Sequence, residues 1–377
     1  MDNSKTVNVG VIGCGIICQN YLSNMVGIYP WMKVTACADL HPETARAMAA
    51  QFSGVRPMTN DELLSDESID IVLNLTIPAV HTEITLRALE AGKHVYSEKP
   101  FGLNRAEVAK ICATAKARGL LVGCAPDTFL GGGIQTLGKT IREGAIGKVF
   151  TINGNMLFHG PESFHPRAEF YYLPGGGPLF DMGPYYLNTF ISILGPVKRV
   201  TGMAVRGASK RCFGNGPRIP KEQVGRPIEI HVDTHIESLL EFANGATGRL
   251  TTSWDVWGTE TPNIEVHGEY GSIVFTDPNS YSGLIKLKRE NDEAWQEIRP
   301  VHCTQCGRGI GVADMADAIL KDRSTFRANG ELAAHVIDVM QSIFEAAAQK
   351  RWIDVESTCS VPEPLAPWLP LGSIGQD

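Results

Sequence analysis

The chain has 377 residues, of which 43% are hydrophobic and 20% are charged, a balance typical of a globular protein long enough for two domains. Its formal net charge of −7 and the absence of any Lys/Arg cluster argue against a nucleic-acid partner. The longest apolar runs have only the length of strands, which argues against a membrane partner, and residues 1–5 hold no signal-peptide core, so we expect a cytoplasmic protein.

The first segment has the pattern of a strand, a glycine turn and a helix. Residues 7–12 are an apolar run, and Gly13-Cys14-Gly15 follows it directly. Gly13 can adopt backbone angles closed to other residues, and Gly15 lets the main chain approach a pyrophosphate. The helix that follows begins near Ile16 and Ile17 and offers free N–H groups to that phosphate. The segment therefore predicts a dinucleotide-binding unit.

Asp39 ends the next apolar run, at roughly the separation of about 20 residues that this unit places between its glycine turn and an acid. Such a carboxylate accepts hydrogen bonds from both ribose hydroxyls and repels a 2′-phosphate. No arginine follows it in Leu40-His41-Pro42. We therefore expect NAD as the cofactor and consider NADP less favoured.

Strands and helices alternate over residues 1–126, which predicts a doubly wound parallel sheet, a Rossmann domain. The pattern gives helices at 42–52, 61–64, 80–91 and 105–118, and strands at 69–75, 94–97 and 120–124. A ligand of such a sheet binds at the carboxyl ends of its strands. Those ends are expected at Gly13, Asp39, Thr76, Glu98-Lys99 and Pro126-Asp127.

Residues 127–360 change to a second, α+β domain with a large, mainly antiparallel open sheet, and 361–377 form a tail. Its helices are expected at 134–143, 182–194, 311–320 and 331–348, and its β segments at 149–156, 199–207, 232–242, 246–253, 263–267, 272–275 and 284–287. Asn244-Gly245 is a hairpin turn signal between two of these segments. We expect the last two helices to close this second domain.

Two clusters could carry chemistry. Glu98-Lys99-Pro100 follows a strand, and a proline there, which can be cis, would aim Lys99 into the gap between the domains, although a solvated lysine in a surface turn is the plain alternative. Asp181 lies near the start of a helix after three glycines, with Tyr185 one turn later on the same face. Asp181 could also be only a helix cap.

At this point the chain resembles the Gfo/Idh/MocA oxidoreductases. The resemblance rests on the strand–glycine turn–helix start, Thr76-Ile77-Pro78-Ala79-Val80-His81, Glu98-Lys99-Pro100 and the Gly-Gly-Gly-Pro-Leu-Phe-Asp181-Met-Gly183 run. It implies a Rossmann domain, a C-terminal domain whose open sheet often forms homodimers or homotetramers, and NAD(P)-dependent oxidation or reduction of a sugar, a cyclitol such as inositol, or a related secondary alcohol. It also implies that Lys99 is the catalytic lysine and Asp181 the conserved site aspartate.

Tyr185 stands where that family usually has a histidine. Histidine titrates near 6.5 and tyrosine near 10, so Tyr185 could act as a base only if a cation such as Lys99 lowers its pKa. Otherwise Lys99, desolvated and partly neutral, takes the proton, and we favour Lys99 as the principal acid and base. Glu98, Thr76 and His81 are expected beside the cofactor, although His81 could equally be a helix-start residue without a ligand.

Substrate contacts are expected from the last strand end of the first domain, from the aromatic loop before Asp181 and from one β segment. They are Asp127, Phe129, His165, Tyr172, Asp181, Tyr185 and His235. His165 is a second candidate proton carrier. The nine cysteines favour reduced thiols, and His302-Cys303-Thr304-Gln305-Cys306 lacks the second ligand pair of a zinc site, so no metal is expected.

The leading hypothesis is an NAD(H)-dependent oxidoreductase that moves hydride between nicotinamide and a secondary alcohol or ketone of a sugar, glycoside or cyclitol. A related alternative uses transient oxidation of a sugar ring to eliminate a group, with the hydride returned afterwards. A third is a non-catalytic NAD-sensing protein. The lysine and aspartate count against the third, and Tyr185 leaves it open.

Overall fold

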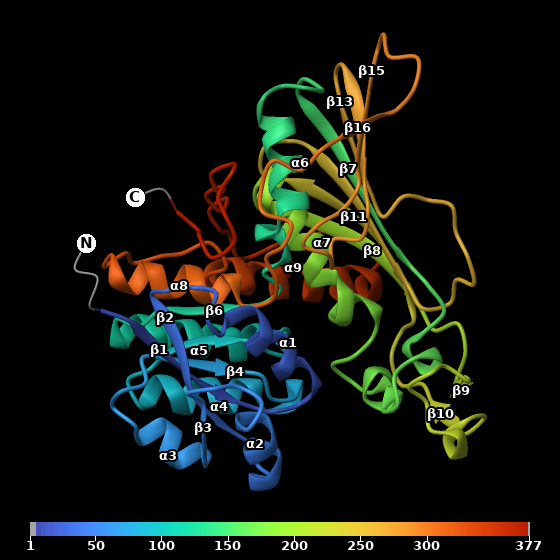
Figure 1. The fold of residues 1–377 in the computed structure, drawn as a ribbon. Helices are drawn as coiled ribbons and strands as arrows, with labels where there is room; N and C mark the ends of the chain where they lie inside the picture. The colour runs from blue at the N-terminus through green and yellow to red at the C-terminus, as the bar shows by residue number, and fades with distance from the viewer. Residues whose placement is uncertain (1–4, 376–377) are drawn as a thin grey trace.

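The computed structural model describes residues 5–375. Residues 1–4, where no signal-peptide core is expected, and the last two residues of the tail lie outside the described residues. Its N-terminal part is built on one parallel sheet in the order β3-β2-β1-β4-β5-β6 (Figure 1). The strands are β1 (Val7–Ile12), β2 (Met32–Ala38), β3 (Arg56–Met58), β4 (Ile71–Asn74), β5 (His94–Ser97) and β6 (Val122–Cys124). The helices are α1 (Ile16–Met25), α2 (Pro42–Ala49), α3 (Asn60–Ser65), α4 (His81–Glu90) and α5 (Arg105–Arg118).

The strand order reverses between β1 and β4, and this reversal positions the site. Ligands of doubly wound sheets bind in the crevice at the carboxyl ends of the strands, at such a switch point. The turn after β1, the end of β2 and the loops after β4 and β5 meet at this edge because all six strands are parallel. The predicted Rossmann sheet is therefore confirmed.

The C-terminal part is built on a nine-stranded sheet in the order β16-β15-β14-β13-β7-β12-β11-β8-β17, in which only β7 and β12 pair in parallel. Its strands are β7 (Val149–Leu157), β8 (Val197–Val205), β11 (His235–Phe242), β12 (Thr247–Ser253), β13 (Ile264–Gly268), β14 (Gly271–Phe275), β15 (Ile285–Arg289), β16 (Gln296–Ile298) and β17 (Ile353–Asp354). A separate hairpin pairs β9 (Lys210–Cys212) with β10 (Pro227–Glu229). The expected mainly antiparallel sheet is confirmed.

Helices cover only one face of this second sheet. They are α7 (Pro178–Leu194) and α9 (Gly330–Gln349), with α6 (Gly132–Arg142) packed beside α7, whereas α8 (Ile310–Leu320) packs against β1 of the first sheet. The short 3₁₀ turns are η1 (Pro78–Val80), η2 (Thr128–Leu130), η3 (Pro161–Ser163), η4 (Ala168–Tyr172) and η5 (Lys221–Gln223). Gly154 in β7 leaves room for Tyr186 and Phe190 of α7, since a Cβ there would lie 2.6 Å from Phe190. Close packing of α7 on the sheet therefore fixes the position of the residues at its start.

The last two helices differ from expectation, because they join the two parts rather than close the second alone. Trp31 Nε1 donates to the carbonyl oxygen of Ala313 in α8 at 3.3 Å. Helix α9 packs against α5 and β6 of the first sheet as well as against β8 of the second. Figure 1 shows α8 lying over the Rossmann sheet and α9 running between this sheet and the second one.

Other differences are short elements and boundaries. Helix α7 begins at Pro178, earlier than the expected 182, which places Asp181 in its first turn. The short strands β3, β9, β10, β16 and β17 were not predicted. The Asn244-Gly245 turn joins β11 to β12 as expected, with Gly245 at φ +87°. Within residues 5–375, none of the helices has the length and apolar character needed to cross a bilayer.

Candidate active site

Lys99 and Asp181 come from the two different parts of the chain and meet at the edge described above. Lys99 follows β5, and its Nζ donates to Asp181 Oδ1 at 2.6 Å and to the Asp181 carbonyl oxygen at 2.7 Å. Both side chains are less than one-fifth exposed. The Lys99–Pro100 peptide bond is cis. Asp181 is therefore a direct partner of the lysine, and its side chain makes no hydrogen bond as a cap of α7.

Tyr185 lies one helical turn beyond Asp181 and is flanked by two cations. The Lys99 Nζ lies 5.7 Å from the centre of its ring, and the Arg308 guanidinium carbon lies 5.9 Å from it. Arg308 Nη2 donates to the Tyr185 hydroxyl oxygen at 3.2 Å. The site therefore holds two basic side chains, of which sequence reasoning identified only the lysine.

Glu98, which directly precedes Lys99, contacts Arg308 and the main chain of Lys99. Its Oε1 accepts a hydrogen bond from the Tyr21 hydroxyl at 2.9 Å and lies 3.7 Å from Arg308 Nη1. Its Oε2 accepts from the Lys99 main-chain N–H at 2.9 Å. Both carboxylate oxygens are thus used within the protein, where they hold the turn that carries Lys99.

The charges decide which groups carry protons. Burial alone would lower the pKa of Lys99, but the Asp181 carboxylate raises it above its ordinary value. Burial raises the pKa of Tyr185, although Lys99 and Arg308 act to lower it. At neutral pH the lysine is therefore an ammonium and the tyrosine a neutral hydroxyl. A partly neutral Lys99 does not fit this state, because the Asp181 carboxylate outweighs burial. Lys99 and Arg308 do act to lower the pKa of Tyr185, but burial outweighs them.

The glycine turn has the features that a nucleotide phosphate requires. Gly13 has φ +104°, and a Cβ there would lie 2.6 Å from the main chain of Leu75, so the position demands glycine. A Cβ at Gly15 would meet no atom within 4 Å, so the space beside this residue is open. Asp39 Oδ2 accepts from the Cys14 N–H at 2.8 Å, which brings the acid against the turn. These residues fit a dinucleotide.

Large aliphatic side chains stand exposed around the same edge. Ile16 is 67% exposed, Leu40 is 83% exposed and Ile77 is 64% exposed, and they follow β1, β2 and β4. Such apolar side chains next to an open phosphate site suit the faces of an adenine ring. Ile17 is half-buried against the core. Leu40 and Ile77 were not predicted as cofactor contacts. The signal for them was their position directly after Asp39 and Thr76, two expected strand ends.

Thr76 and His81 lie at this edge in different ways. Thr76 is half-buried, and its hydroxyl donates to Asn74 Oδ1 at 2.7 Å. His81 is 1% exposed, and its two ring nitrogens lie 2.9 Å from the carbonyl oxygens of Pro100 and Thr76. Burial lowers the pKa of His81. The prediction that His81 contacts the cofactor is therefore wrong, because the ring is enclosed and ties the loop after β4 to the loop that carries Lys99.

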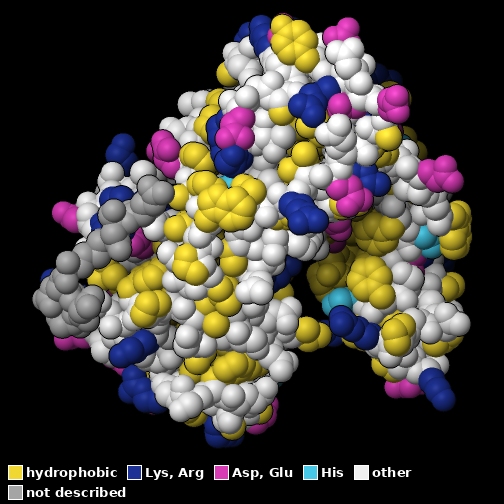
Figure 2. All heavy atoms as spheres, turned by 45° about the horizontal axis from the view of Figure 1, so that its top comes forward, with side chains coloured by type: hydrophobic (Ala, Val, Ile, Leu, Met, Phe, Trp, Pro, Cys, Tyr) yellow, Lys and Arg dark blue, Asp and Glu magenta, His cyan; other side chains and the backbone are white. Residues whose placement is uncertain are grey.

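An aromatic group borders the Lys99–Asp181 pair on the loop that precedes α7. Tyr171 stacks on Phe170 at 4.0 Å between ring centres, and His165 packs edge-on against both rings. Burial raises the pKa of Tyr171 to about 12, and the Asp181 charge acts in the same direction. Burial lowers the pKa of His165, whose Nδ1 accepts from the Arg167 N–H. Figure 2 shows a hollow between the Rossmann part and the C-terminal part of the chain. Hydrophobic and histidine side chains line the C-terminal side of this hollow.

Two expected substrate contacts at the end of β6 are structural instead. Asp127 is 0% exposed, and its carboxylate accepts from the Gly309 and Gly311 N–H groups at 2.9 Å and from the Tyr281 hydroxyl. Phe129 is a core residue with 1% exposure. These two predictions are wrong because the Asp127 carboxylate is hydrogen-bonded within the protein and the Phe129 ring is buried in the core.

Tyr172 and His235 also point elsewhere. Tyr172 is 0% exposed and donates to Glu162, so its neighbour Tyr171 is the tyrosine at the site. His235 lies in β11 on the face opposite the buried Ile236, which is the face away from α7, 3.5 Å from the Glu237 carboxylate. A change of one residue in a strand or extended loop reverses the side chain's direction, which the sequence pattern did not resolve.

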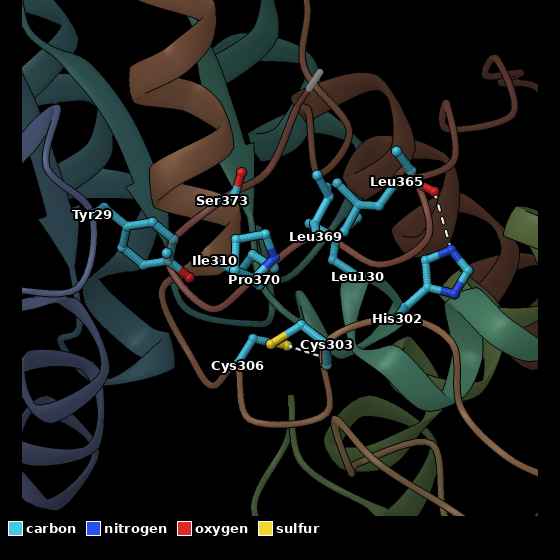
Figure 3. Close-up of a pocket in the computed structure, with 12 residues that line it drawn as sticks. Tyr29, Leu130, His302, Cys303, Cys306, Ile310, Leu365, Leu369, Pro370 and Ser373 are labelled. Atoms are coloured by element: carbon cyan, nitrogen blue, oxygen red, sulfur yellow. Dashed lines mark hydrogen bonds between the residues drawn. The ribbon is translucent and has the colours of Figure 1, made fainter. Parts of the chain in front are cut away.

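The cysteine motif belongs to a junction, not to the site. Cys303, Cys306 and His302 line a cavity of only about 10 Å³ together with the tail residues Leu365, Leu369 and Pro370 (Figure 3). Cys306 Sγ donates to the Cys303 carbonyl oxygen at 3.2 Å, and His302 Nε2 lies 3.2 Å from the Leu365 carbonyl oxygen. Across residues 5–375, no three His, Cys, Asp or Glu side chains gather in the manner of a metal site.

Comparisons with known proteins agree with the fold of the two parts of the chain. Residues 7–125 match the model of an oxidoreductase family with an NAD-binding Rossmann fold, and residues 134–274 match that of the GFO/IDH/MocA C-terminal domain. A dTDP-3,4-didehydro-2,6-dideoxy-alpha-D-glucose 3-reductase of Actinomadura kijaniata is 28% identical over 80% of this chain and 84% of its own length. The levoglucosan dehydrogenase of Pseudarthrobacter phenanthrenivorans is 24% identical over 93% of this chain and 98% of its own. Among solved structures, a levoglucosan dehydrogenase in complex with NADH and L-sorbose has the same fold, with a TM-score of 0.78, 21% identity and coverage of 94% of this chain and 100% of its own.

Proposed function

Because the chain belongs to the Gfo/Idh/MocA family of oxidoreductases with an NAD-binding Rossmann domain, we propose that it moves hydride between NAD and a secondary alcohol or ketone carbon of a carbohydrate. Relatives that bear the names levoglucosan dehydrogenase, D-xylose dehydrogenase and dTDP-sugar 3-reductase support a carbohydrate substrate. The observation that carries the proposal is the contact of Lys99 with Asp181 beside Tyr185, at the carboxyl edge of the Rossmann sheet.

The chain's own residues would hold the cofactor along that edge. The turn at Gly13 and Gly15, with the first N–H groups of α1 at Ile16 and Ile17, receives the pyrophosphate, and Asp39 receives the ribose hydroxyls. Thr76 remains a proposed contact. The cofactor supplies the hydride donor or acceptor at the far end of the crevice.

Lys99 and Tyr185 handle the proton and the charge on the substrate oxygen. Two of the three Lys99 ammonium hydrogens are donated to Asp181, which leaves the third for that oxygen. The neutral Tyr185 hydroxyl is a second donor. During reduction of a ketone both groups stabilise the developing alkoxide and one of them protonates it. During oxidation the same oxygen loses its proton to the lysine, which must first be deprotonated.

The aromatic group before α7 supports a ring-shaped polyol as the substrate. Tyr171 and Phe170 offer flat apolar surfaces, and the Tyr171 hydroxyl and His165 offer polar atoms at their edges. A pyranose or a cyclitol presents the matching pattern of C–H faces and hydroxyl edges. His165 stays a second proposed proton carrier.

The test is a panel of monosaccharides, glycosides, anhydrosugars and inositols, followed by NADH absorbance in both directions. Turnover of at least one carbohydrate with NAD(H) supports the proposal. Release of an aglycone without net NADH would instead support cleavage by transient ring oxidation. Failure of every carbohydrate and keto sugar, with NADH bound, would contradict the proposal and leave a nucleotide-binding protein.

We also propose that two or four copies associate through the uncovered face of the second sheet. Met203, Val205 and Leu239 stand on that face at 70%, 51% and 50% exposure, an apolar surface suited to a second copy. Leu239→Glu should shift the particle toward the monomer in sedimentation, and an unchanged mass would contradict this interface. The cytoplasm remains the proposed location, supported by nine cysteines that are all free thiols.

A further inference from the structure

We infer that Arg308 is a positioning residue, which holds the Tyr185 hydroxyl so that its hydrogen faces the substrate side of the crevice. The inference rests on the proposed function, because it gives a role to the tyrosine of that same site. Arg308 lies in the connection between β16 and α8, far in sequence from every motif at the crevice. Nothing in its local sequence, Cys306-Gly307-Arg308-Gly309, resembles a catalytic motif.

The hydrogen bond between Arg308 and Tyr185 can run in only one direction. A guanidinium group can only donate, so the bond of 3.2 Å from Arg308 Nη2 uses a lone pair of the Tyr185 oxygen. The hydroxyl hydrogen must then point away from the arginine. Among residues 5–375 no acceptor takes that hydrogen, and Tyr185 is only 3% exposed, so a ligand accepts it only when seated directly against the hydroxyl.

The Arg308 side chain is itself held in place. Its Nη2 also donates to Asn279 Oδ1 at 3.1 Å, and its Nη1 lies 3.7 Å from Glu98 Oε1. Nη1 is enclosed and has no hydrogen-bond partner within the described chain, so the guanidinium sits between Glu98 and Tyr185 without reaching solvent on that side. The side chain as a whole is only 17% exposed.

The loop that carries Arg308 is anchored to other segments of the chain. The buried carboxylate of Asp127 accepts the N–H groups of Gly309 and Gly311 at 2.9 Å. Gly309 packs against Met25 so closely that a Cβ there would lie 2.4 Å from its side chain. The tail adds a third anchor, because the Trp368 N–H donates to the Val301 carbonyl oxygen at 2.8 Å. Asp127 thus holds the loop that carries Arg308, and this is the structural role of its fully buried carboxylate.

These contacts give the arginine two effects on Tyr185. It orients the hydroxyl, and its positive charge stabilises the tyrosinate that remains when the proton is given to a substrate oxygen. A lysine at position 308 would keep the charge but lose the fixed geometry of the planar guanidinium. A methionine would fill similar volume and remove both.

The experiment is a double-mutant cycle on kcat with NADH and the best carbohydrate of the panel. Tyr185→Phe should lower kcat about 100-fold, the usual range for loss of a positioned acid. Arg308→Met should lower kcat about tenfold with little change in KM for NADH, and Arg308→Lys should recover part of the loss. In the Tyr185→Phe background Arg308→Met should change kcat less than about twofold, because the residue it acts through is gone.

Arg327→Met is the matched control, since Arg327 is another largely buried arginine, 14% exposed, whose partner is Asp314. It should lower the melting temperature but leave kcat and its pH profile unchanged. The inference would be overturned if the double variant lost kcat by the product of the two single-variant losses. It would also be overturned if Arg308→Met kept the wild-type kcat.

A second readout does not depend on activity. In protein labelled with 3-fluorotyrosine, the ¹⁹F resonance that disappears in Tyr185→Phe should shift and titrate at higher pH in Arg308→Met, and should not move in Arg327→Met. A resonance unaffected by Arg308→Met would overturn the inference even if the enzyme is active. If the resonance shifts in Arg308→Met but the protein turns over no carbohydrate, the contact between Arg308 and Tyr185 is supported and only the proposed function is contradicted.

Discussion

The Lys99 ammonium group and the Asp181 carboxylate form an ion pair of 2.6 Å across the boundary between the two parts of the chain. The second hydrogen bond, from the same ammonium to the Asp181 carbonyl oxygen, fixes the lysine to the first turn of α7. A group that is both charged and oriented in this way is a strong hydrogen-bond donor toward an oxygen in the crevice. The pair also predicts how activity depends on pH.

Asp181→Asn should move the pH profile of alcohol oxidation toward lower pH. Oxidation needs a deprotonated Lys99, and the Asp181 charge is a main cause that raises the pKa of Lys99. Removal of that charge lowers the lysine pKa, so the rising limb of kcat against pH should shift down by one unit or more, while the maximal kcat falls by about tenfold or more through lost orientation. A limb that stays in place or moves to higher pH would contradict the pairing. The Asp61→Asn variant, on exposed α3, is the control.

Gly13 and Gly15 should respond differently to alanine. At Gly13 the added Cβ would lie 2.6 Å from the Leu75 main chain with φ at +104°, so Gly13→Ala should lower the unfolding free energy by about 2 kcal/mol or more. At Gly15 the Cβ meets nothing and φ is −73°, so Gly15→Ala should keep the melting temperature and lose NADH affinity. Thermal unfolding and NADH fluorescence titration check both. Wild-type NADH affinity in Gly15→Ala would refute the phosphate position.

Asp39 should set the choice between NAD and NADP. Asp39→Ser removes the acceptor for the ribose hydroxyls and the charge that repels a 2′-phosphate, so KM for NAD should rise about tenfold while KM for NADP falls. The hydrogen bond to the Cys14 N–H is lost as well, so the melting temperature is measured in parallel. An unchanged ratio of the two kcat/KM values would show that Asp39 does not face the ribose.

His335 should make the fold sensitive to mild acid. It is 0% exposed, its Nε2 accepts from the Val197 N–H at 2.9 Å, and burial lowers its pKa from 6.5 to about 4. The unfolded chain therefore binds a proton below pH 6.5 that the folded chain does not bind until about pH 4, so stability is fully present above pH 6.5 and is lost as the pH falls toward 4. The loss amounts to about 3 kcal/mol. Urea titrations from pH 7 to 4 on the wild type and on His335→Gln, which should show a flatter dependence, check this.

The sequence predicted those features that local pattern determines. Apolar runs, Gly13 and the acid at Asp39 define the Rossmann unit, because a buried parallel strand and a phosphate turn each demand particular residue types. Lys99 was found because it follows a strand and Asp181 because it lies near a helix start after three glycines, and the family resemblance implied the role of each. The exact bounds of α5 and β5 followed from Gly119 as a C-cap and from a short apolar run.

The remaining parts of the site depend on contacts between distant segments. Arg308 lies in a loop that is hydrogen-bonded to Asp127 and to the tail, and no local signal marks such a residue. Asp127 was misassigned for the same reason, since a carboxylate at a strand end can serve a ligand or a neighbouring loop. The choice between Tyr171 and Tyr172 depends on the direction of one side chain within a short turn.

The most direct measurement is the rate of hydride transfer in a single turnover, followed by NADH absorbance, for the wild type and Lys99→Met at saturating cofactor and substrate. We expect Lys99→Met to bind NADH with the wild-type Kd and to lose about 10³-fold in the rate, because both the proton path and the charge that stabilises the alkoxide are removed. A Lys99→Met enzyme that transfers hydride within about threefold of the wild-type rate would contradict the assignment of this crevice as the catalytic site.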